Sequence, residues 1–187
     1  MHTTTTRSLL ALATFAVLAA AAPVAPATAS PLRGDVEVDP TAYALAGNSL
    51  HVGIGYRHLR LDLGNYAMAL PQAVHGDDGF DVRFAGYGAK LQWFRRADQT
   101  GAFVGVDAGL ARVHARLQGS DLAADDLQFS TGVNAGYRWS LGHGLYVTPW
   151  LGVGYAWSAD DISLGGKTFA PSSVTVFPAV HLGYRFE

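Results

Sequence analysis

The sequence contains no cysteine and very few of the long charged side chains that usually cover a soluble domain. Among 187 residues there are two lysines and two glutamates, and charged residues make up 15%, against about 25% in an ordinary domain. The lack of cysteine excludes disulfide frameworks, Cys-ligated zinc, iron–sulfur clusters and thiol nucleophiles. The net charge of −2 argues against a nucleic-acid partner. This composition indicates that much of the surface does not face water.

Long apolar runs are absent after the first thirty residues. Residues 1–29 have the pattern of a cleaved signal peptide, with Arg7, an apolar stretch from Ser8 to Ala22 and an Ala-Thr-Ala site before Ser30. That stretch is shorter than the ~20 residues that a membrane-spanning helix needs. We therefore expect a signal peptide over 1–29 and a single exported domain over 30–187. That domain is either soluble outside the cytoplasm or a β-barrel in an outer membrane.

The exported part alternates between apolar and polar residues with a period of two, which is typical of β-strands with one apolar face. The pattern predicts five strands near the C-terminus: Tyr87–Phe94, Ala102–Leu117, Leu127–Ser140, Leu145–Ser158 and Val174–Phe186. In the first two the apolar positions slip by one residue. We therefore predict β-bulges near Ala85-Gly86 and Ala111-Arg112.

The N-terminal part predicts three more strands, Asp35–Asp39, Ser49–Gly55 and Leu59–Met68. Between the first two, Asp39, Pro40 and Gly47 fit the cap, first turn and end of a short helix over Thr41–Ala46. The alternative is one long strand from Leu50 to Leu63, which gives six strands in total. We favour eight, because a six-stranded barrel would be very narrow.

The connections alternate between short and long, as they do in bacterial outer-membrane barrels. Tight links are expected at 96–101 and 141–144, and long ones near 71–79, 118–126 and 159–173. The fold class predicted is therefore all-β: a closed antiparallel up-and-down transmembrane barrel of eight strands with a short N-terminal helix.

The face opposite the apolar one distinguishes a membrane barrel from the alternative, a soluble secreted ligand-binding barrel. It carries Gly, Ser, Asn and Thr rather than Lys and Glu, and glycines recur there, as a narrow lumen filled by side chains requires. They are Gly88, Gly105, Gly109, Gly132, Gly136, Gly152, Gly154 and Gly183. Large aromatic residues of the apolar face lie near the strand ends, as in membrane-interface girdles. These are Trp93, Tyr137, Trp139, Tyr184 and Phe186 at one end, and Tyr155 and Trp157 at the other.

The last strand ends in His181-Leu182-Gly183-Tyr184-Arg185-Phe186, which resembles the closing strand of small barrels in the OmpA-like and OmpW-like families. The resemblance implies the outer membrane of a Gram-negative bacterium, and the signal peptide predicts Sec-type export. It also implies recognition of the terminal aromatic residue by the barrel-assembly machinery. Glu187, which follows Phe186, departs from the family's pattern. The resemblance implies fold and location, and hardly bears on activity.

Three groups of residues are candidate sites. The lumen is predicted to hold a polar cluster in which Asp107 pairs with Lys90 and Arg138 or Arg185 joins them. Its members are Lys90, Gln92, Asp107, Asn134, Arg138, His181 and Arg185. The long loops form an acidic rim, whose oxygen atoms suit Ca²⁺ or Mg²⁺ bridging to lipopolysaccharide phosphates; the alternative is simple solvation. The rim comprises Asp77, Asp78, Asp81, Asp121, Asp125, Asp126, Asp160 and Asp161.

The third group is a pair of prolines, Pro149 and Pro178, on the apolar face of adjacent strands. Because proline cannot donate a ladder hydrogen bond, the pair could mark a lateral gate for a lipid chain or a hydrophobic solute. Lipid A palmitoyltransferases of the PagP type are similar in having prolines beside lateral openings. The alternative is a local bulge through which no molecule passes.

The sequence favours a structural barrel, or one that passes small or hydrophobic molecules, over an enzyme. No histidine lies in a recognisable acyl-transfer motif. On the rim, one group of residues resembles a catalytic site, namely His75 with Asp77 and Asp78. A lipid A-modifying enzyme, by acyl transfer or deacylation, remains the alternative. We expect no cofactor, no resident metal and no nucleic acid, and a monomer whose partners are outer-membrane lipids and lipopolysaccharide.

Overall fold

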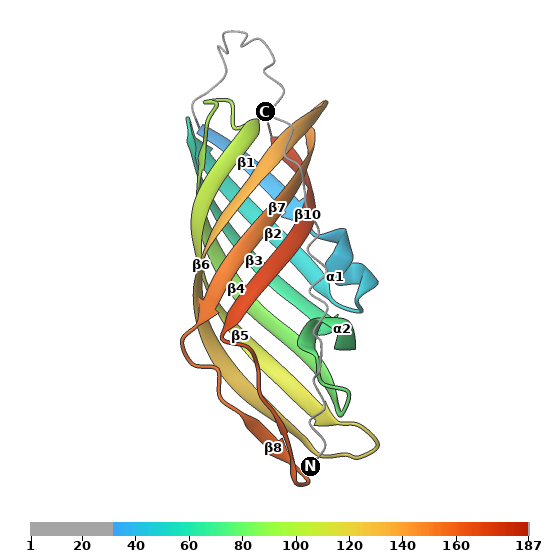
Figure 1. The fold of residues 1–187 in the computed structure, drawn as a ribbon. Helices are drawn as coiled ribbons and strands as arrows, with labels where there is room; N and C mark the ends of the chain where they lie inside the picture. Colours follow the sequence, from blue (N-terminus) through green and yellow to red (C-terminus); the bar gives the residue numbers. More distant parts are fainter. Residues whose placement is uncertain (1–31, 187) are drawn as a thin grey trace, which may run out of the picture.

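The computed structural model describes residues 32–186, which form one closed antiparallel barrel of eight strands. The expected signal peptide lies outside the described residues. Around the barrel the strand order is β1-β10-β7-β6-β5-β4-β3-β2, and β8 and β9 form a separate hairpin (Figure 1). The strands are β1 (Leu32–Val38), β2 (Asn48–Tyr56), β3 (Leu59–Leu70), β4 (Phe80–Phe94), β5 (Gly101–Leu117), β6 (Ala123–Gly142), β7 (Leu145–Ala156), β8 (Ile162–Leu164), β9 (Lys167–Phe169) and β10 (Val174–Phe186). The prediction of eight strands is confirmed, and the six-strand alternative is wrong.

The short and long connections lie at opposite ends of the barrel. At the short-turn end, tight links join β2 to β3, β4 to β5 and β6 to β7, and β10 ends there. The other end, called the loop end below, carries α1 (Pro40–Ala44), α2 (Gln72–His75), the β5–β6 loop and the β8–β9 hairpin (Figure 1). Among the described residues, no helix has the length and apolarity needed to cross a membrane.

The short helix α1 begins as the sequence predicts. The Asp39 side chain accepts a hydrogen bond from the Thr41 backbone N–H, and Pro40 occupies the first turn. The helix ends earlier than expected, however, because Ala46 rather than Gly47 adopts a positive φ, of 54°. Gly47 is required for a different reason: a Cβ atom there would overlap the Ala67 carbonyl oxygen on β3.

The two predicted β-bulges are absent from β4 and β5. The register between these strands runs without a shift from Phe80 opposite Leu117 to Phe94 opposite Phe103. What changes is the chemistry of the two faces. Toward the short-turn end the outward face of β5 is apolar, whereas at the loop end Arg112, His114 and Arg116 face outward. The backbones of β4 and β5 therefore continue without a bulge. The one-residue slip of the apolar positions in the sequence marks the height at which the apolar side chains change from the outer to the inner face of the barrel.

Beyond this change the loop end has an apolar core inside the barrel. Its buried members come from β4, β5 and the β8–β9 hairpin: Phe80, Val82, Val113, Ala115, Ile162 and Phe169. We call this the tip core. The Phe80 and Phe169 rings lie 5.8 Å apart, so the hairpin packs directly on the strand tips. In this half the barrel resembles a water-soluble protein, with apolar residues inside and polar residues outside.

In the other half the arrangement is reversed, and a band of apolar side chains covers the outside. On β5 the outward residues from Ala102 to Leu110 are all apolar over nine residues, which matches the ~9–11 residues of a tilted membrane-spanning strand. Large exposed side chains continue this band on the other strands, among them Ile54, Leu63, Leu91, Val133, Leu151, Val176 and Leu182. The expected aromatic residues lie at its edges, with Trp93, Trp139 and Phe186 outward at one end and Trp157 at the other.

The barrel closes through a short seam between β1 and β10. Among residues 32–186, five residue pairs join them, from Gly34 opposite Phe186 to Val38 opposite Leu182. Alternate residues of β1 point their backbone N–H and C=O groups toward β10, and after Val38 the next one is Pro40. Pro40 would lie opposite Val180, but it has no N–H and begins α1. From Val174 to His181 β10 is therefore paired with β7 alone in the described structure. Helix α1 projects from the wall beside this unpaired edge (Figure 1).

Candidate functional site

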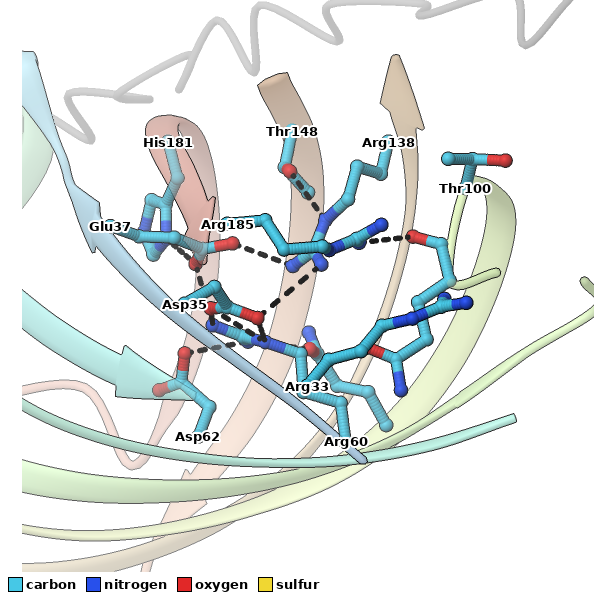
Figure 2. A network of polar contacts seen from close by, with 12 residues as sticks. Arg33, Asp35, Glu37, Arg60, Asp62, Thr100, Arg138, Thr148, His181 and Arg185 are labelled. Atoms are coloured by element: carbon cyan, nitrogen blue, oxygen red, sulfur yellow. Dashed lines mark hydrogen bonds and ion pairs between the residues drawn. The ribbon is translucent and has the colours of Figure 1, made fainter. Parts of the chain in front are cut away.

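Arg60 on β3 lies at the centre of a charged cluster that fills the lumen. Its Nε donates to Asp35 at 3.0 Å and its Nη1 to Asp62 at 2.7 Å and to Gln92 at 2.9 Å. Its Nη2 lies 3.4 Å from a Glu37 oxygen. The Arg60 side chain is completely buried. Strand alternation explains the convergence, because Asp35 and Glu37 on β1, and Arg60 and Asp62 on β3, are spaced by two and all point inward (Figure 2).

A second arginine extends this cluster from the opposite wall. Arg138 on β6 donates to Glu37 at 2.6 Å and to the Thr148 hydroxyl at 3.2 Å. The other Glu37 oxygen lies 2.9 Å from His181 Nδ1, as Figure 2 shows. The Arg138 guanidinium also lies 4.1 Å from the centre of the Tyr146 ring. Charged hydrogen bonds and stacking stabilise a cation that would be very costly to bury alone, although its Nη1 has only an ion contact of 3.8 Å with Asp35.

The charges of this cluster balance. Lys90 approaches Asp62 at 3.6 Å, and the other contact of that Asp62 oxygen is with His51 Nδ1 at 2.8 Å. Three carboxylates therefore face two arginines and a lysine, with two histidines beside them. We call these residues the lumen charge cluster: Asp35, Glu37, Arg60, Asp62, Lys90 and Arg138, with His51 and His181.

Glycines make room for these large side chains. A Cβ atom on Gly53 would lie 2.4 Å from Asp35 and 2.5 Å from Arg60, and one on Gly64 would lie 2.1 Å from the His51 ring. On β10, a Cβ atom on Gly183 would meet the Tyr146 ring at 2.2 Å. The lumen at this height is filled by interlocking side chains, as expected for eight strands.

The β4–β5 turn covers the lumen at the short-turn end. The Gln99 side chain is fully buried and its Nε2 donates to the carbonyls of Arg57 and Leu59, both at 3.0 Å. Arg185 holds the same turn by donating to the carbonyls of Asp98 and Gln99. A hollow of about 180 Å³ remains beside it, between the turn, Arg138 and Tyr146. The β4–β5 turn and Arg138 therefore block the lumen at two successive heights.

Asp98 stabilises this turn from within. It accepts hydrogen bonds from Arg96 at 2.6 Å and from the Thr100 hydroxyl at 2.8 Å and backbone N–H at 3.0 Å. Although partial burial raises the pKa of Asp98, these donors outweigh it and hold that pKa well below its usual range. The carboxylate is therefore ionised at any physiological pH, and the turn stays anchored.

The structure places all seven predicted lumen residues on the inner face, but with partners that differ from the prediction. Lys90 and Asp107 lie directly opposite each other, yet Lys90 contacts Asp62, and Asp107 accepts a hydrogen bond from Asn134 at 2.7 Å. Arg185 binds backbone carbonyls at the turn rather than Asp107. The lumen residues predicted from the sequence lie only on the later strands. The prediction therefore did not include the acids at the centre of the cluster or Arg60, which lie on β1 and β3.

The eight aspartates of the acidic rim do not form one cluster. Asp81 and Asp125 face outward on β4 and β6, where Arg116 and His114 contact them. Hydrogen bonds from Arg116 and Gln118 lower the pKa of Asp81. Asp126 accepts from Gln128 and from the Asp160 N–H, and Asp77 accepts from the Gly79 N–H. Within residues 32–186 no group of three or more His, Asp or Glu side chains could hold a metal ion.

The two prolines lie on different edges of their strands. Strands β7 and β10 are paired continuously across both, with Pro178 opposite Leu151 and Pro149 opposite Val180. Pro149 faces β6, at an interruption of that ladder between Gly136 and Trp139. Pro178 faces the unpaired edge of β10, where no ladder hydrogen bond is lost. The stretch of the wall without ladder pairing therefore lies at the seam between β10 and β1.

Comparison with known proteins gives likenesses to solved structures alone. No protein-family model matches the chain, and no curated protein matches it. Neisserial surface protein A is similar at 17% identity with a TM-score of 0.48, over 82% of this chain and 94% of that one. The N-terminal β-barrel domain of Pseudomonas aeruginosa OprF is similar at 14% identity with a TM-score of 0.46, over 82% and 97%.

Proposed function

We propose that this protein is an integral β-barrel of a Gram-negative outer membrane with a structural role, and that its lumen is sealed. The observation that carries the proposal is the outward apolar band, nine residues tall on β5, bounded by aromatic residues and by arginines. A water-soluble barrel would bury such a band, whereas a lipid bilayer covers it. Closure of the sheet satisfies the backbone groups that hydrocarbon would leave unpaired, except along the edge of β10 from Val174 to His181.

The sealed lumen is supported by the lumen charge cluster and by the β4–β5 turn. Arg60, Arg138, Asp35 and Asp62 are each at most 1% exposed, so no water-filled path passes them. Moving them aside would separate buried ion pairs, which costs several kcal/mol. A structural role fits this geometry better than general diffusion does.

The test is the conductance of the purified, refolded protein in planar lipid bilayers. We expect no lasting stepwise conductance at moderate voltage, whereas a general porin inserted under the same conditions conducts. Heat-modifiable migration on gels establishes, separately, that the sample is folded. Regular conductance steps from folded protein would overturn the sealed lumen, and a failure to enter bilayers at all would overturn the membrane assignment.

A second candidate function, lateral access of apolar molecules to the lumen, is favoured by the missing ladder pairing along β10 at the seam. The unpaired edge of β10 lies within the apolar band, since Val176 and Val180 beside it are exposed outward. Just inside that edge, Phe177 on β10 packs against Trp150 on β7 with ring centres 5.8 Å apart. An acyl chain that passed between β10 and α1 would therefore meet an aromatic pair, of which the Trp150 ring also contacts the Lys90 ammonium at 4.8 Å.

Tryptophan quenching by lipids with brominated acyl chains tests this access. Trp150 faces the lumen, whereas Trp93, Trp139 and Trp157 face outward. In a variant with the three outward tryptophans changed to Phe, we expect brominated chains to quench Trp150. A variant that keeps only Trp93 is the matched control, and it must be quenched wherever the barrel is inserted. Quenching of Trp93 without quenching of Trp150 would rule out access through the seam.

A further inference from the structure

Straight strands at the loop end bring a group of arginines to one outward wall. Arg83 on β4 lies directly opposite His114 on β5. Arg112 and Arg116 flank His114 on the same face, so both are diagonal neighbours of Arg83, at a typical spacing of ~7–8 Å. We call Arg83, Arg112, His114 and Arg116 the arginine patch. The sequence did not indicate this patch, because the expected bulges would have kept the apolar residues outward and turned these side chains away from the outer face.

The arginine patch begins where the apolar band ends. On β5 the outward residue before Arg112 is Leu110, and the residue directly opposite Arg112 on β6 is Leu127. Lysine and arginine at the loop end of the described chain comprise the three arginines of the patch and Lys167. At the loop end, the arginines next to the band therefore all lie on the β4–β5 wall, and Lys167 lies on the β8–β9 hairpin.

Two of the three arginines keep most of their donors free. The Arg116 guanidinium is engaged by Asp81 at 2.8 Å. Arg83 donates to the Ala46 carbonyl at 2.7 Å through one nitrogen, and Arg112 has an ion contact of 3.9 Å with Asp125. Asp125 is itself bound by His114 at 2.7 Å. The Arg112 side chain is 69% exposed, so its guanidinium can accept a new partner without losing a strong one.

We propose that the arginine patch binds the phosphate groups of a phosphorylated glycolipid of the outer leaflet, the lipid A part of lipopolysaccharide. This rests on the proposed membrane location. Lipid head groups lie directly outside the hydrocarbon layer, which is the height of Arg112. Guanidinium groups bind phosphate through paired hydrogen bonds, and three arginines outnumber the two aspartates beside them. The acyl chains of such a lipid would lie along Leu110 and Leu127 on the same wall.

The experiment compares two double variants with the same change of charge. R83Q/R112Q removes the freer arginines of the patch, and R57Q/R95Q removes two exposed arginines from the short-turn end. Retention of diphosphorylated lipid A by each folded barrel is measured by native mass spectrometry from detergent. We expect R57Q/R95Q to bind as the unchanged protein does. R83Q/R112Q is expected to bind roughly 10- to 30-fold more weakly, from about fivefold per arginine near a charged lipid surface.

Two further probes identify the source of the phosphate. Lipid A stripped of its phosphates should bind the unchanged protein as weakly as diphosphorylated lipid A binds R83Q/R112Q, and phosphatidylglycerol should bind less than lipid A. Equal losses in both double variants, or no loss in either, would overturn the proposal. Heat-modifiable migration and insertion into vesicles are measured on the same samples. An inserted barrel that fails to bind lipid A therefore contradicts the patch alone, and a barrel that never inserts contradicts the membrane location.

Discussion

Changing Arg60 to methionine should lower the free energy of unfolding by about 3–5 kcal/mol, which is the usual cost of removing one partner from a buried ion pair. Arg60 donates to Asp35, Asp62 and Gln92 at once and is completely buried. Methionine roughly preserves its length but leaves two carboxylates without their main counter-charge. Unfolding in urea, followed from vesicles by the gel shift of the folded form, measures the change.

Two control variants separate the loss of charge from the loss of a side chain. Arg95→Met removes an exposed arginine and should change stability by less than about 0.5 kcal/mol. Adding Asp35→Asn and Asp62→Asn to Arg60→Met removes the unpaired charges and should recover part of the loss. If Arg60→Met and Arg95→Met were equally stable, the lumen charge cluster would not be what holds the strands together.

Changing Val106 to arginine should destabilise the inserted barrel by about 2–4 kcal/mol, the cost of a cation on the lipid face near the middle of a bilayer. Val106 is the central member of the outward apolar run on β5 and is 55% exposed. In a soluble barrel an exposed valine could be replaced by arginine at almost no cost. This substitution therefore distinguishes the membrane barrel from the soluble alternative more sharply than any change in the lumen.

Leu127→Arg is the matched control. Leu127 is directly opposite Arg112 and is 63% exposed, so it is at least as open as Val106 but lies at the edge of the apolar band. We expect a cost of about 0–1 kcal/mol there. Equilibrium unfolding of both variants from the same vesicles gives the comparison. Equal costs at the two positions, whether large or small, would contradict the placement of the bilayer.

The architecture was predictable from the sequence because strand alternation is a local signal. Each apolar position is two residues from the next, and Asp39-Pro40 marks the helix between the first two strands. The predicted bulges failed for one reason: alternation reports which side is apolar, and not which side is inside. At Phe84 and Tyr87 the apolar residues change from the inner to the outer face while the backbone continues unshifted. Only the environment outside the barrel differs between the two halves, and the alternation within a single strand does not reveal that environment.

The centre of the lumen charge cluster was less accessible, because its contacts join distant parts of the chain. Glu37 and Arg138 are 101 residues apart and Glu37 and His181 are 144 apart. One signal was available: Asp35 with Glu37, and Arg60 with Asp62, are charges spaced by two among apolar residues. Charges in that pattern must face a lumen if the residues between them face lipid. The individual pairings depend on barrel register, which no local pattern determines.

The tip core constrains the order in which the molecule can be assembled. Its members come from β4, β5 and the β8–β9 hairpin, so no continuous segment holds enough of it to fold alone. All three parts lie at the loop end, beyond the apolar band. In the proposed outer-membrane barrel, with the loop end on the outer side, they would have to cross the bilayer before Phe169 could pack against Phe80. The β8–β9 hairpin comes after β4 and β5 in the chain, so the tip core would then be completed only after those two strands are paired.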